Sequence, residues 1–180
     1  MLVGYQGAPG AFGEAAALGL WPGAATIGVT TFEEVVSGVR SGRLDAGVLP
    51  VENRIVGPVR TALAALVDAK GLEQTRDITV AVAFQLLGTR ESSLESLATV
   101  LGHPVALAQC RRFLSRLRAT IRDWYDSAGA ARMLAVRPDR TVGVIASRGA
   151  ATRYGLTILA AEVDDVPDNA TRFIALERRR

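Results

Sequence analysis

The chain repeats one series of elements: a short apolar stretch typical of a β-strand, a turn or capping residue, and a helical stretch. The first series runs from a strand at Leu2–Gln6 through a turn at 7–10 into a helical stretch at 11–20. After the longest extended stretch, residues 78–87, the same series starts again. Strands that alternate with helices favour sheets built from βαβ units, and a series that restarts favours two such lobes. We therefore expect an α/β protein with a two-lobed, type II periplasmic-binding-protein-like fold and its active site in the cleft between the lobes.

The last apolar stretches, 156–163 and 171–177, are expected to return the chain to the first lobe. Lobe 1 then comprises residues 1–76 and 165–180, and lobe 2 comprises residues 77–164. Further strands are expected at 26–29, 44–51, 99–101, 121–124 and 141–146, and further helices at 31–42, 58–68, 106–117, 128–135 and 147–154, with a short helix opened by Ser92 or Ser93. Three of these helices are expected to be capped, by Thr31, Asp126-Ser127 and Ser147, and Gly155 is expected to end the last one.

Composition excludes several classes of protein. A hydrophobic content of 49% with 22% charged residues is typical of a globular chain. No apolar run approaches the roughly 20 residues of a membrane helix, and the chain enters a strand without a signal sequence, so we expect a cytoplasmic protein. Cys110 cannot form an internal disulfide, and with His103 as the only histidine there is no Cys/His metal set. No full nucleotide-binding loop is present either, so neither a metal nor a cofactor is expected.

Arginine supplies nearly all of the positive charge, since Lys70 is the only lysine and the net charge is +3. The arginines are dispersed except at 178–180, and few aromatic residues are present to stack on bases. This pattern does not fit a nucleic-acid-binding surface, and neither nucleic acid nor a membrane is an expected partner. Arginine is well suited to carboxylates, which favours a small anionic ligand.

The stretch Asp168–Phe173 places a hydroxyl, on Thr171, and a guanidinium, on Arg172, at the beginning of a predicted strand. Loops and strand ends at such places carry function. The alternative is structural: Thr171 is there for its β-propensity and Arg172 is solvated. Other polar groups fall at the same kind of position, the end of a strand or the start of a helix: Glu52, Asn53, His103, Gln109, Ser127 and the glycines Gly7 and Gly10.

Each of these positions also has a structural interpretation. Glu52 could form a salt bridge or a cap, His103 could be the N-cap of the helix that begins at Pro104, and residues 7–10 could be a plain strand-to-helix turn. The set holds no pair of nucleophile and base. By chemistry alone it fits either a small-anion sensor or an enzyme whose unstable substrate needs positioning and a proton donor.

Several motifs together resemble the catalytic domain of prephenate dehydratase, and the resemblance runs over nearly the whole chain. They are Tyr5–Phe12 with Glu14–Ala16, Leu49–Asn53, His103-Pro104 with Ala106–Cys110, Ser127-Ala128 with Ala130-Ala131, Ile145–Ser147 with Ala150-Ala151 and Tyr154–Leu156, and Asn169–Phe173.

The resemblance implies a lyase of phenylalanine biosynthesis that removes water and carbon dioxide from prephenate, a dicarboxylate, to give phenylpyruvate. It implies that the hydroxyl of Thr171 donates to the leaving oxygen, and that Arg172 holds a carboxylate or orients Thr171. The resemblance also implies which residues bind the substrate: Asn53, Glu52, His103, Gln109, Ser127, Phe173, Gly7 and Gly10. In particular, the 7–10 turn and the helix start at Ser127 are expected to take anionic oxygens.

The chain departs from the family pattern where Arg54, Gly102 and Pro58 replace usual serines, Asp126-Ser127 replaces a Ser-Thr pair, and Phe84 replaces a common histidine. These departures keep three alternatives open: arogenate as substrate, a relaxed cyclohexadienyl dehydratase, or a binding lobe without turnover. The chain ends after the catalytic-domain strand, so we expect no ACT regulatory domain. By resemblance the protein is a homodimer or a higher homo-oligomer.

Overall fold

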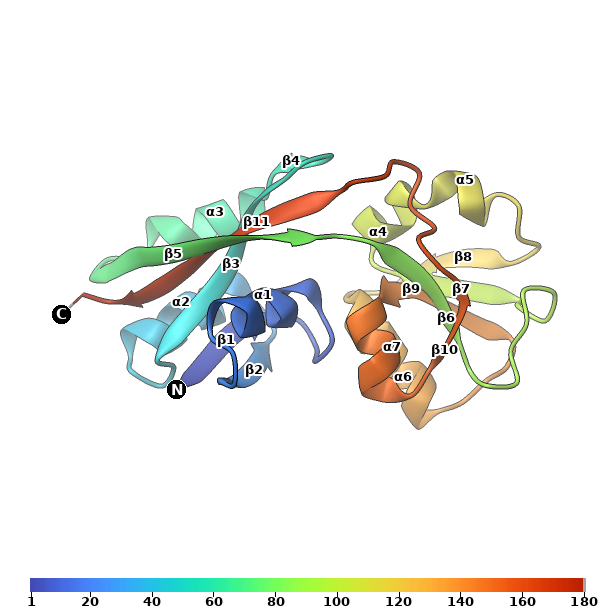
Figure 1. The fold of residues 1–180 in the computed structure, drawn as a ribbon, viewed down its shortest axis with the longest axis horizontal. Helices are drawn as coiled ribbons and strands as arrows, with labels where there is room; N and C mark the ends of the chain where they lie inside the picture. The colour runs from blue at the N-terminus through green and yellow to red at the C-terminus, as the bar shows by residue number, and fades with distance from the viewer. Residues whose placement is uncertain (180) are drawn as a thin grey trace. The chain divides into compact units, whose positions relative to one another are not determined.

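The computed structural model describes residues 1–179, which form two α/β units (Figure 1). Unit 1 comprises Met1–Gly7, Phe12–Val82 and the chain from Asn169 onward, and unit 2 comprises Ala8–Ala11 and Ala83–Asp168. The chain passes between the units a few residues later than expected at both crossings. The predicted type II periplasmic-binding-protein-like architecture, two α/β lobes with crossing strands, is confirmed.

Unit 1 is built on one sheet with the strand order β2-β1-β3-β11-β5, and the short strand β4 pairs with β3. Strands β1, β2 and β3 are parallel, whereas β11 is antiparallel to both β3 and β5. Its elements are β1 (Leu2–Gln6), α1 (Phe12–Leu20), β2 (Ala25–Val29), α2 (Phe32–Arg40), β3 (Ala46–Asn53), β4 (Gly57–Pro58), α3 (Arg60–Val67), β5 (Leu72–Ala81) and β11 (Ala170–Arg178).

Helices cover both faces of this sheet. On one face, Ala16 and Ala17 of α1 pack in a cluster with Phe173 of β11. On the other face, side chains of α2 and α3 pack in a second cluster that includes Ile174 and Leu176. Successive side chains of a strand point to opposite faces, so β11 is buried on both sides and its position in the sheet is strongly determined.

Unit 2 has a sheet with the order β10-β6-β9-β7-β8. Strands β7 and β8 run parallel to β9, and β6 is antiparallel to β9 and to β10. Each sheet therefore contains one strand that the chain enters directly from the other unit, β11 or β6, and in each sheet this strand is second from an edge. The elements of unit 2 are β6 (Phe84–Gly88), β7 (Thr99–Gly102), α4 (Pro104–Gln109), α5 (Arg111–Leu114), β8 (Thr120–Asp123), α6 (Ser127–Val136), β9 (Val142–Ser147), α7 (Arg148–Tyr154) and β10 (Thr157–Ala160).

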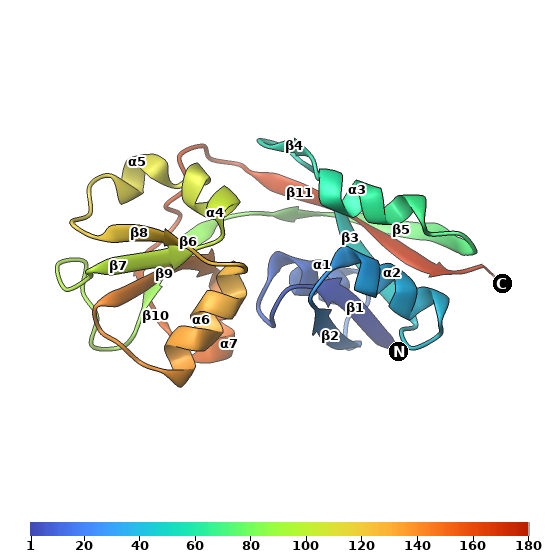
Figure 2. The same ribbon diagram turned by 180° about the vertical axis from the view of Figure 1, so that it is seen from behind.

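The helices α6 and α7 of unit 2 lie side by side (Figure 2), and one core cluster of this unit packs between them and the sheet. Small residues such as Ala130, Ala131 and Ala150 are fully buried there and bring these helices close to Val144 and Ala146 of β9. Within residues 1–179, no helix is both long and apolar enough to cross a membrane.

Helix-capping residues predicted from the sequence are confirmed. The side chain of Thr31 accepts a hydrogen bond from the N–H of Glu34, and that of Ser147 accepts one from the N–H of Ala150. His103 and Asp126 are the N-caps of α4 and α6. Gly155 ends α7 in the left-handed conformation, with φ of 65°.

The predicted single extended stretch 78–87 is wrong, because it belongs to two strands in two different sheets. Between β5 and β6 the backbone turns to other partners: the N–H of Val82 donates to the carbonyl of Asn169 at 2.8 Å, and that of Phe84 donates to a carboxylate oxygen of Asp164 at 2.8 Å. These bonds replace sheet pairing between β5 and β6. Their partners are distant in sequence, so residues 78–87 alone do not predict the break.

The predicted helix 106–117 is also interrupted, at Cys110. The carbonyl of Gln109 accepts a hydrogen bond from the N–H of Asp165 at 2.6 Å, and the carboxylate of Asp165 accepts one from the N–H of Arg112 at 2.9 Å. A remote aspartate thus takes one backbone carbonyl and one backbone N–H that a continuous helix would each pair with a residue four positions away.

Two smaller expectations were wrong as well. Ser92 and Ser93 open turns rather than a helix, since their side chains bond to the nearby backbone N–H groups of Thr89 and Ser96, as serine often does. The stretch 156–163 forms only the short strand β10, which pairs with β6 inside unit 2, and the return to unit 1 follows it.

Candidate active site

The side-chain amide of Asn53 is the centre of a buried polar cluster in unit 1. Asn53 ends β3 and lies opposite Thr171 of β11 in the sheet register. Its Nδ2 atom lies 2.9 Å from Oγ1 of Thr171, 2.9 Å from Oδ1 of Asn169 and 3.2 Å from the carbonyl oxygen of Ala170. Asn53, Asn169 and Thr171 expose only 8%, 2% and 7% of their surface. The two strand ends are thus joined by a buried network of side chains.

The orientation of this amide follows from its other contacts. Oδ1 of Asn53 accepts the backbone N–H groups of Ile55 at 3.0 Å and Val56 at 2.9 Å. Backbone N–H groups can only donate, so the amide oxygen must face them and the NH₂ group must face Thr171. Both amide hydrogens and both lone pairs of the amide oxygen are therefore used inside unit 1.

The same geometry determines what the hydroxyl of Thr171 can do. Its oxygen accepts from Asn53, and its own hydrogen has no acceptor within residues 1–179. A buried hydroxyl held in this way presents a hydrogen-bond donor. In addition, the hydrogen bond from Asn53 polarises the hydroxyl and strengthens it as a donor.

Glu52 and Arg172 are neighbours of this pair but lie at the surface. They are opposite one another in the β3–β11 register, with Oε2 of Glu52 4.0 Å from Nε of Arg172. Their side chains are 61% and 45% exposed, respectively, so the ion pair contributes little to stability. The salt bridge that was one alternative for Glu52 is present, and it leaves donors of the guanidinium for another partner.

Phe173 and the two glycines are placed by packing. Phe173 is 4% exposed and lies in the core cluster with residues of α1. Gly10 has φ of +91°, and a Cβ atom added to it would lie 2.6 Å from Cα of Ala150. Gly7 has φ of 110°, and its carbonyl oxygen would lie 2.0 Å from a Cβ added to Gly28. The glycines thus allow backbone segments to approach closely.

The N-terminus of α6 is already occupied by a carboxylate of the chain itself. Oδ1 of Asp126 accepts from the N–H of Ala128 at 3.1 Å, and Oδ2 accepts from the N–H of Gly129 at 3.1 Å and of Ala8 at 2.8 Å. Sequence reasoning expected these groups, in the helix start at Ser127 and in the 7–10 turn, to take the anionic oxygens of a substrate. Asp126 competes for that place, since the positive end of a helix favours any nearby carboxylate.

His103 and Ser127 form a second polar pair, within unit 2. The backbone N–H of His103 donates to the hydroxyl oxygen of Ser127 at 3.1 Å. Nδ1 of His103 accepts from the N–H of Val105 at 3.3 Å, which confirms the cap and assigns the hydrogen of the neutral ring to Nε2. The Nε2–H of His103 and the hydroxyl hydrogen of Ser127 have no acceptor within residues 1–179. Both remain available as donors.

Gln109 ends α4 beside a group of acidic residues that sequence reasoning missed. Its carbonyl is held by Asp165, and the adjacent Asp164 has one carboxylate oxygen buried without a partner in the described chain. Burial raises the pKa of Asp164, with smaller contributions from Glu162 and Asp165. Burial, followed by the charges of Asp164 and Asp165, also raises the pKa of the Cys110 thiol, so Cys110 is not a thiolate nucleophile.

Asn169 and Asp126 were also missed as members of these networks. Asn169 could have been found from the sequence, because it begins the family motif Asn169–Phe173 that contains Thr171. Only the sheet register, however, brings it to Asn53. Within residues 1–179, no three His, Cys, Asp or Glu side chains are grouped so that they could hold a metal ion.

Comparison with known proteins gives a consistent family match. The family model described as prephenate dehydratase matches residues 3–180. Arogenate dehydratase 2 of Petunia hybrida is 35% identical over 176 residues, which cover 98% of this chain and 44% of the relative. Arogenate dehydratase/prephenate dehydratase 2, chloroplastic, of Arabidopsis thaliana is also 35% identical over 176 residues, covering 98% of this chain and 46% of the relative. The chain thus spans less than half the length of these curated relatives.

Among solved structures, a prephenate dehydratase from Arthrobacter aurescens in complex with L-Phe superposes with a TM-score of 0.90 at 28% identity. The match covers 100% of this chain and 61% of that chain. Agreement in both sequence and backbone over the whole chain, rather than over one motif, identifies the family.

Proposed function

Because the chain belongs to the prephenate dehydratase family, we propose that it catalyses the decarboxylating dehydration of prephenate to phenylpyruvate, a step of phenylalanine biosynthesis. The ring hydroxyl leaves with a proton as water, the bond to the ring carboxylate breaks to release carbon dioxide, and its electron pair completes the aromatic ring. Aromatisation drives the reaction, so the protein has to hold two carboxylates and assist departure of the hydroxyl.

The observation that carries this proposal is the hydrogen bond from Asn53 to Thr171. It leaves the Thr171 hydroxyl as a buried donor with a free hydrogen. We assign Thr171 as the catalytic residue that donates to the leaving oxygen. A threonine hydroxyl is too weak an acid to ionise, so it stabilises the departing oxygen by hydrogen bonding, while a proton taken up from the solvent and relayed through water completes the departing water molecule.

Asn53 was expected to bind the substrate, and we now propose a different role for it. Its amide is fully used by Ile55, Val56, Asn169 and Thr171. Asn53 is therefore a positioning residue that holds the Thr171 hydroxyl in the donor orientation. The buried amide of Asn169 fixes the second hydrogen of Asn53 and supports the same geometry.

Substrate binding is assigned to groups with donors to spare. These are the guanidinium of Arg172, the Nε2–H of His103 and the hydroxyl of Ser127. Gln109 is also proposed to bind the substrate. Glu52 is proposed to act through its ion pair with Arg172, which orients the guanidinium. Gly7, Gly10 and Phe173 are proposed to shape the backbone around the site rather than to bond to the substrate.

Arogenate, which carries an amino group where prephenate carries a keto group, is a second candidate substrate. It is favoured by the names of both plant relatives, one of which names both activities. The cytoplasmic location and the homo-oligomeric assembly stay predictions.

Mixing the purified protein with prephenate and following the absorbance of phenylpyruvate tests the proposal. Saturable product formation that exceeds the protein-free rate is expected. A parallel assay with arogenate, with phenylalanine as the measured product, decides between the substrates by their kcat/KM ratio. Absence of both products, from protein whose fold is verified by circular dichroism, would leave a binding lobe without turnover.

A further inference from the structure

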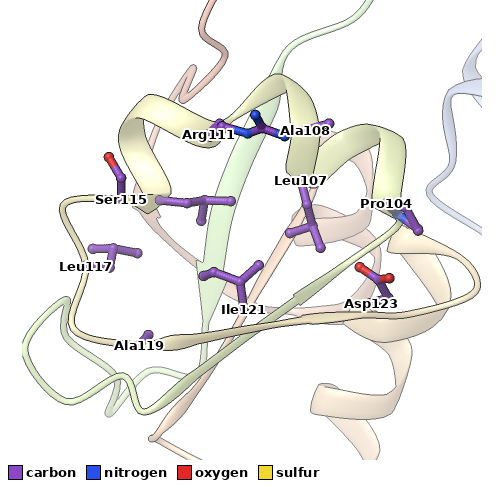
Figure 3. Close-up of a pocket in the computed structure, with 10 residues that line it drawn as sticks. Pro104, Leu107, Ala108, Arg111, Ser115, Leu117, Ala119, Ile121 and Asp123 are labelled. Carbon is purple, nitrogen blue, oxygen red and sulfur yellow. The ribbon is translucent and has the colours of Figure 1, made fainter.

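Unit 2 contains a pocket that none of the proposed site residues lines. It has a volume of about 490 Å³ and lies between α4, α5 and the strand β8 (Figure 3). Pockets of this size are typical of sites for small organic molecules. Ten residues line it: Pro104, Leu107, Ala108, Arg111, Leu114, Ser115, Leu117, Ala119, Ile121 and Asp123.

The interior of this pocket is mainly apolar. Leu107 of α4 and Leu114 of α5 line it, and both are buried, with 7% and 5% of their surface exposed. Ile121 lines it from β8 and is 39% exposed. Because β8 is an edge strand of the sheet, a large aliphatic side chain is left open to solvent beside the pocket. An apolar body that entered the pocket would cover Ile121 and release water from it.

The charges around the pocket are uneven. Residues 111–118 contain four arginines and no acidic residue. None of the four guanidinium groups forms an ion pair with a carboxylate of the described chain, and one of the four residues, Arg111, lines the pocket. The single acidic group of the lining, Asp123, lies next to Pro104, away from Ser115 and Leu117 at the other end (Figure 3).

We propose that this pocket binds a small amphipathic anion, an apolar monocarboxylate. Its apolar body lies along Leu107, Leu114 and Ile121, and its carboxylate pairs with the guanidinium of Arg111, which suits a bidentate contact. Asp123 repels a carboxylate from the Pro104 end and thereby sets the direction of the ligand. The proposal uses none of the residues assigned to the dehydratase reaction, so it holds or fails independently of that function.

The test is a calorimetric titration of the purified protein with decanoate, kept below its micelle concentration. We expect saturable binding at one site, no saturable binding of butyrate, which lacks the apolar body, and none of decylamine, which carries the opposite charge. Arg111→Ala is expected to weaken decanoate binding by about ten-fold or more, because the charged contact is lost. Ala119→Phe, which fills the pocket without changing charge, is expected to weaken it as well.

Arg118→Ala is the matched control. It removes the same charge from the same segment at a position outside the pocket lining, and binding is expected to stay within about two-fold of the wild type because a charge that does not contact the ligand acts on it only through attraction that salt screens. An equal loss in Arg118→Ala and Arg111→Ala would reduce the effect to general electrostatics and overturn the proposal. Absence of saturable decanoate binding would also overturn it. So would binding to anionic lipid vesicles without binding to decanoate, which would make residues 111–118 a membrane-facing surface.

Discussion

The amide nitrogen of Asn53 donates to the hydroxyl oxygen of Thr171 across 2.9 Å, and the two residues face each other in the register of β3 and β11. The amide oxygen is held by two backbone N–H groups, so the donor and the acceptor of this bond cannot exchange places. Thr171 is therefore left with a hydrogen to donate. The proposed chemistry rests on this one relationship.

Replacing Thr171 separates the hydroxyl from the shape of the side chain. Thr171→Val keeps the shape but removes the donor, and kcat for prephenate is expected to fall by about 10²–10⁴. Thr171→Ser keeps the donor, and its kcat is expected to stay within roughly ten-fold of the wild type. Steady-state kinetics measures both. Equal activity of the valine variant and the wild type would reduce Thr171 to a strand residue.

Replacing Asn53 by aspartate tests the proposed orientation. A carboxylate can still accept from Ile55 and Val56, but it places a second acceptor against the oxygens of Asn169 and Thr171. The Thr171 hydroxyl is then expected to turn and donate to the carboxylate, so kcat falls while KM changes little. Burying unmatched acceptors is also expected to lower the free energy of unfolding by about 1–3 kcal/mol. Urea denaturation measures the second effect, and unchanged turnover in a folded Asn53→Asp variant would remove Asn53 from its assigned role.

Two glycine substitutions distinguish close packing from backbone conformation. Gly10 and Gly57 have similar φ angles, +91° and +82°, but an added Cβ would meet the backbone of Ala150 at Gly10 and nothing within 4 Å at Gly57. Gly57→Ala is expected to cost about 1–2 kcal/mol of unfolding free energy for its φ angle alone. Gly10→Ala is expected to cost about 1–3 kcal/mol more, because α7 has to shift. Denaturation of both variants under the same conditions measures the difference, and equal losses would mean that the approach of Gly10 to α7 is not tight.

The raised pKa of Asp164 predicts a pH-dependent difference in stability. Its folded-state pKa lies above the unfolded value of 3.8, chiefly because the carboxyl is buried. The folded protein then binds this proton more tightly, so the contribution of Asp164 to stability is present below pH 3.8 and is lost as pH rises through the folded pKa. Asp164→Asn stays neutral and can still accept from Phe84.

The asparagine variant is therefore expected to gain stability relative to the wild type as pH rises from about 4 to 7. Urea denaturation at three pH values across this range measures the gain, and the other carboxyl groups cancel in the comparison. A stability difference that is constant over the range would contradict the raised pKa.

Much of the fold was predictable from residues close together in sequence. The caps at Thr31, His103, Asp126 and Ser147 and the left-handed stop at Gly155 are local interactions over two to four residues, and each was expected from its residue type. The repeated strand-cap-helix series likewise predicted two α/β units, because that pattern depends on polarity and periodicity alone. Among the candidate site residues, the position of Asn53 at a strand end was predictable in the same way.

Tertiary structure decided which of these local elements end early and which polar groups meet. The break at Cys110 depends on Asp165, more than 50 residues away, and the end of β5 depends on Asn169. The register of β11 against β3 joins Asn53 to Thr171 across 118 residues of sequence. Such contacts satisfy buried backbone and side-chain groups with distant partners, and the choice of partner depends on the packing of the whole sheet rather than on any local pattern. The sequence by itself therefore determined most of the elements and the family. Only the folded chain decided that Asn53 bonds to Thr171 and that a carboxylate of the protein occupies the start of α6.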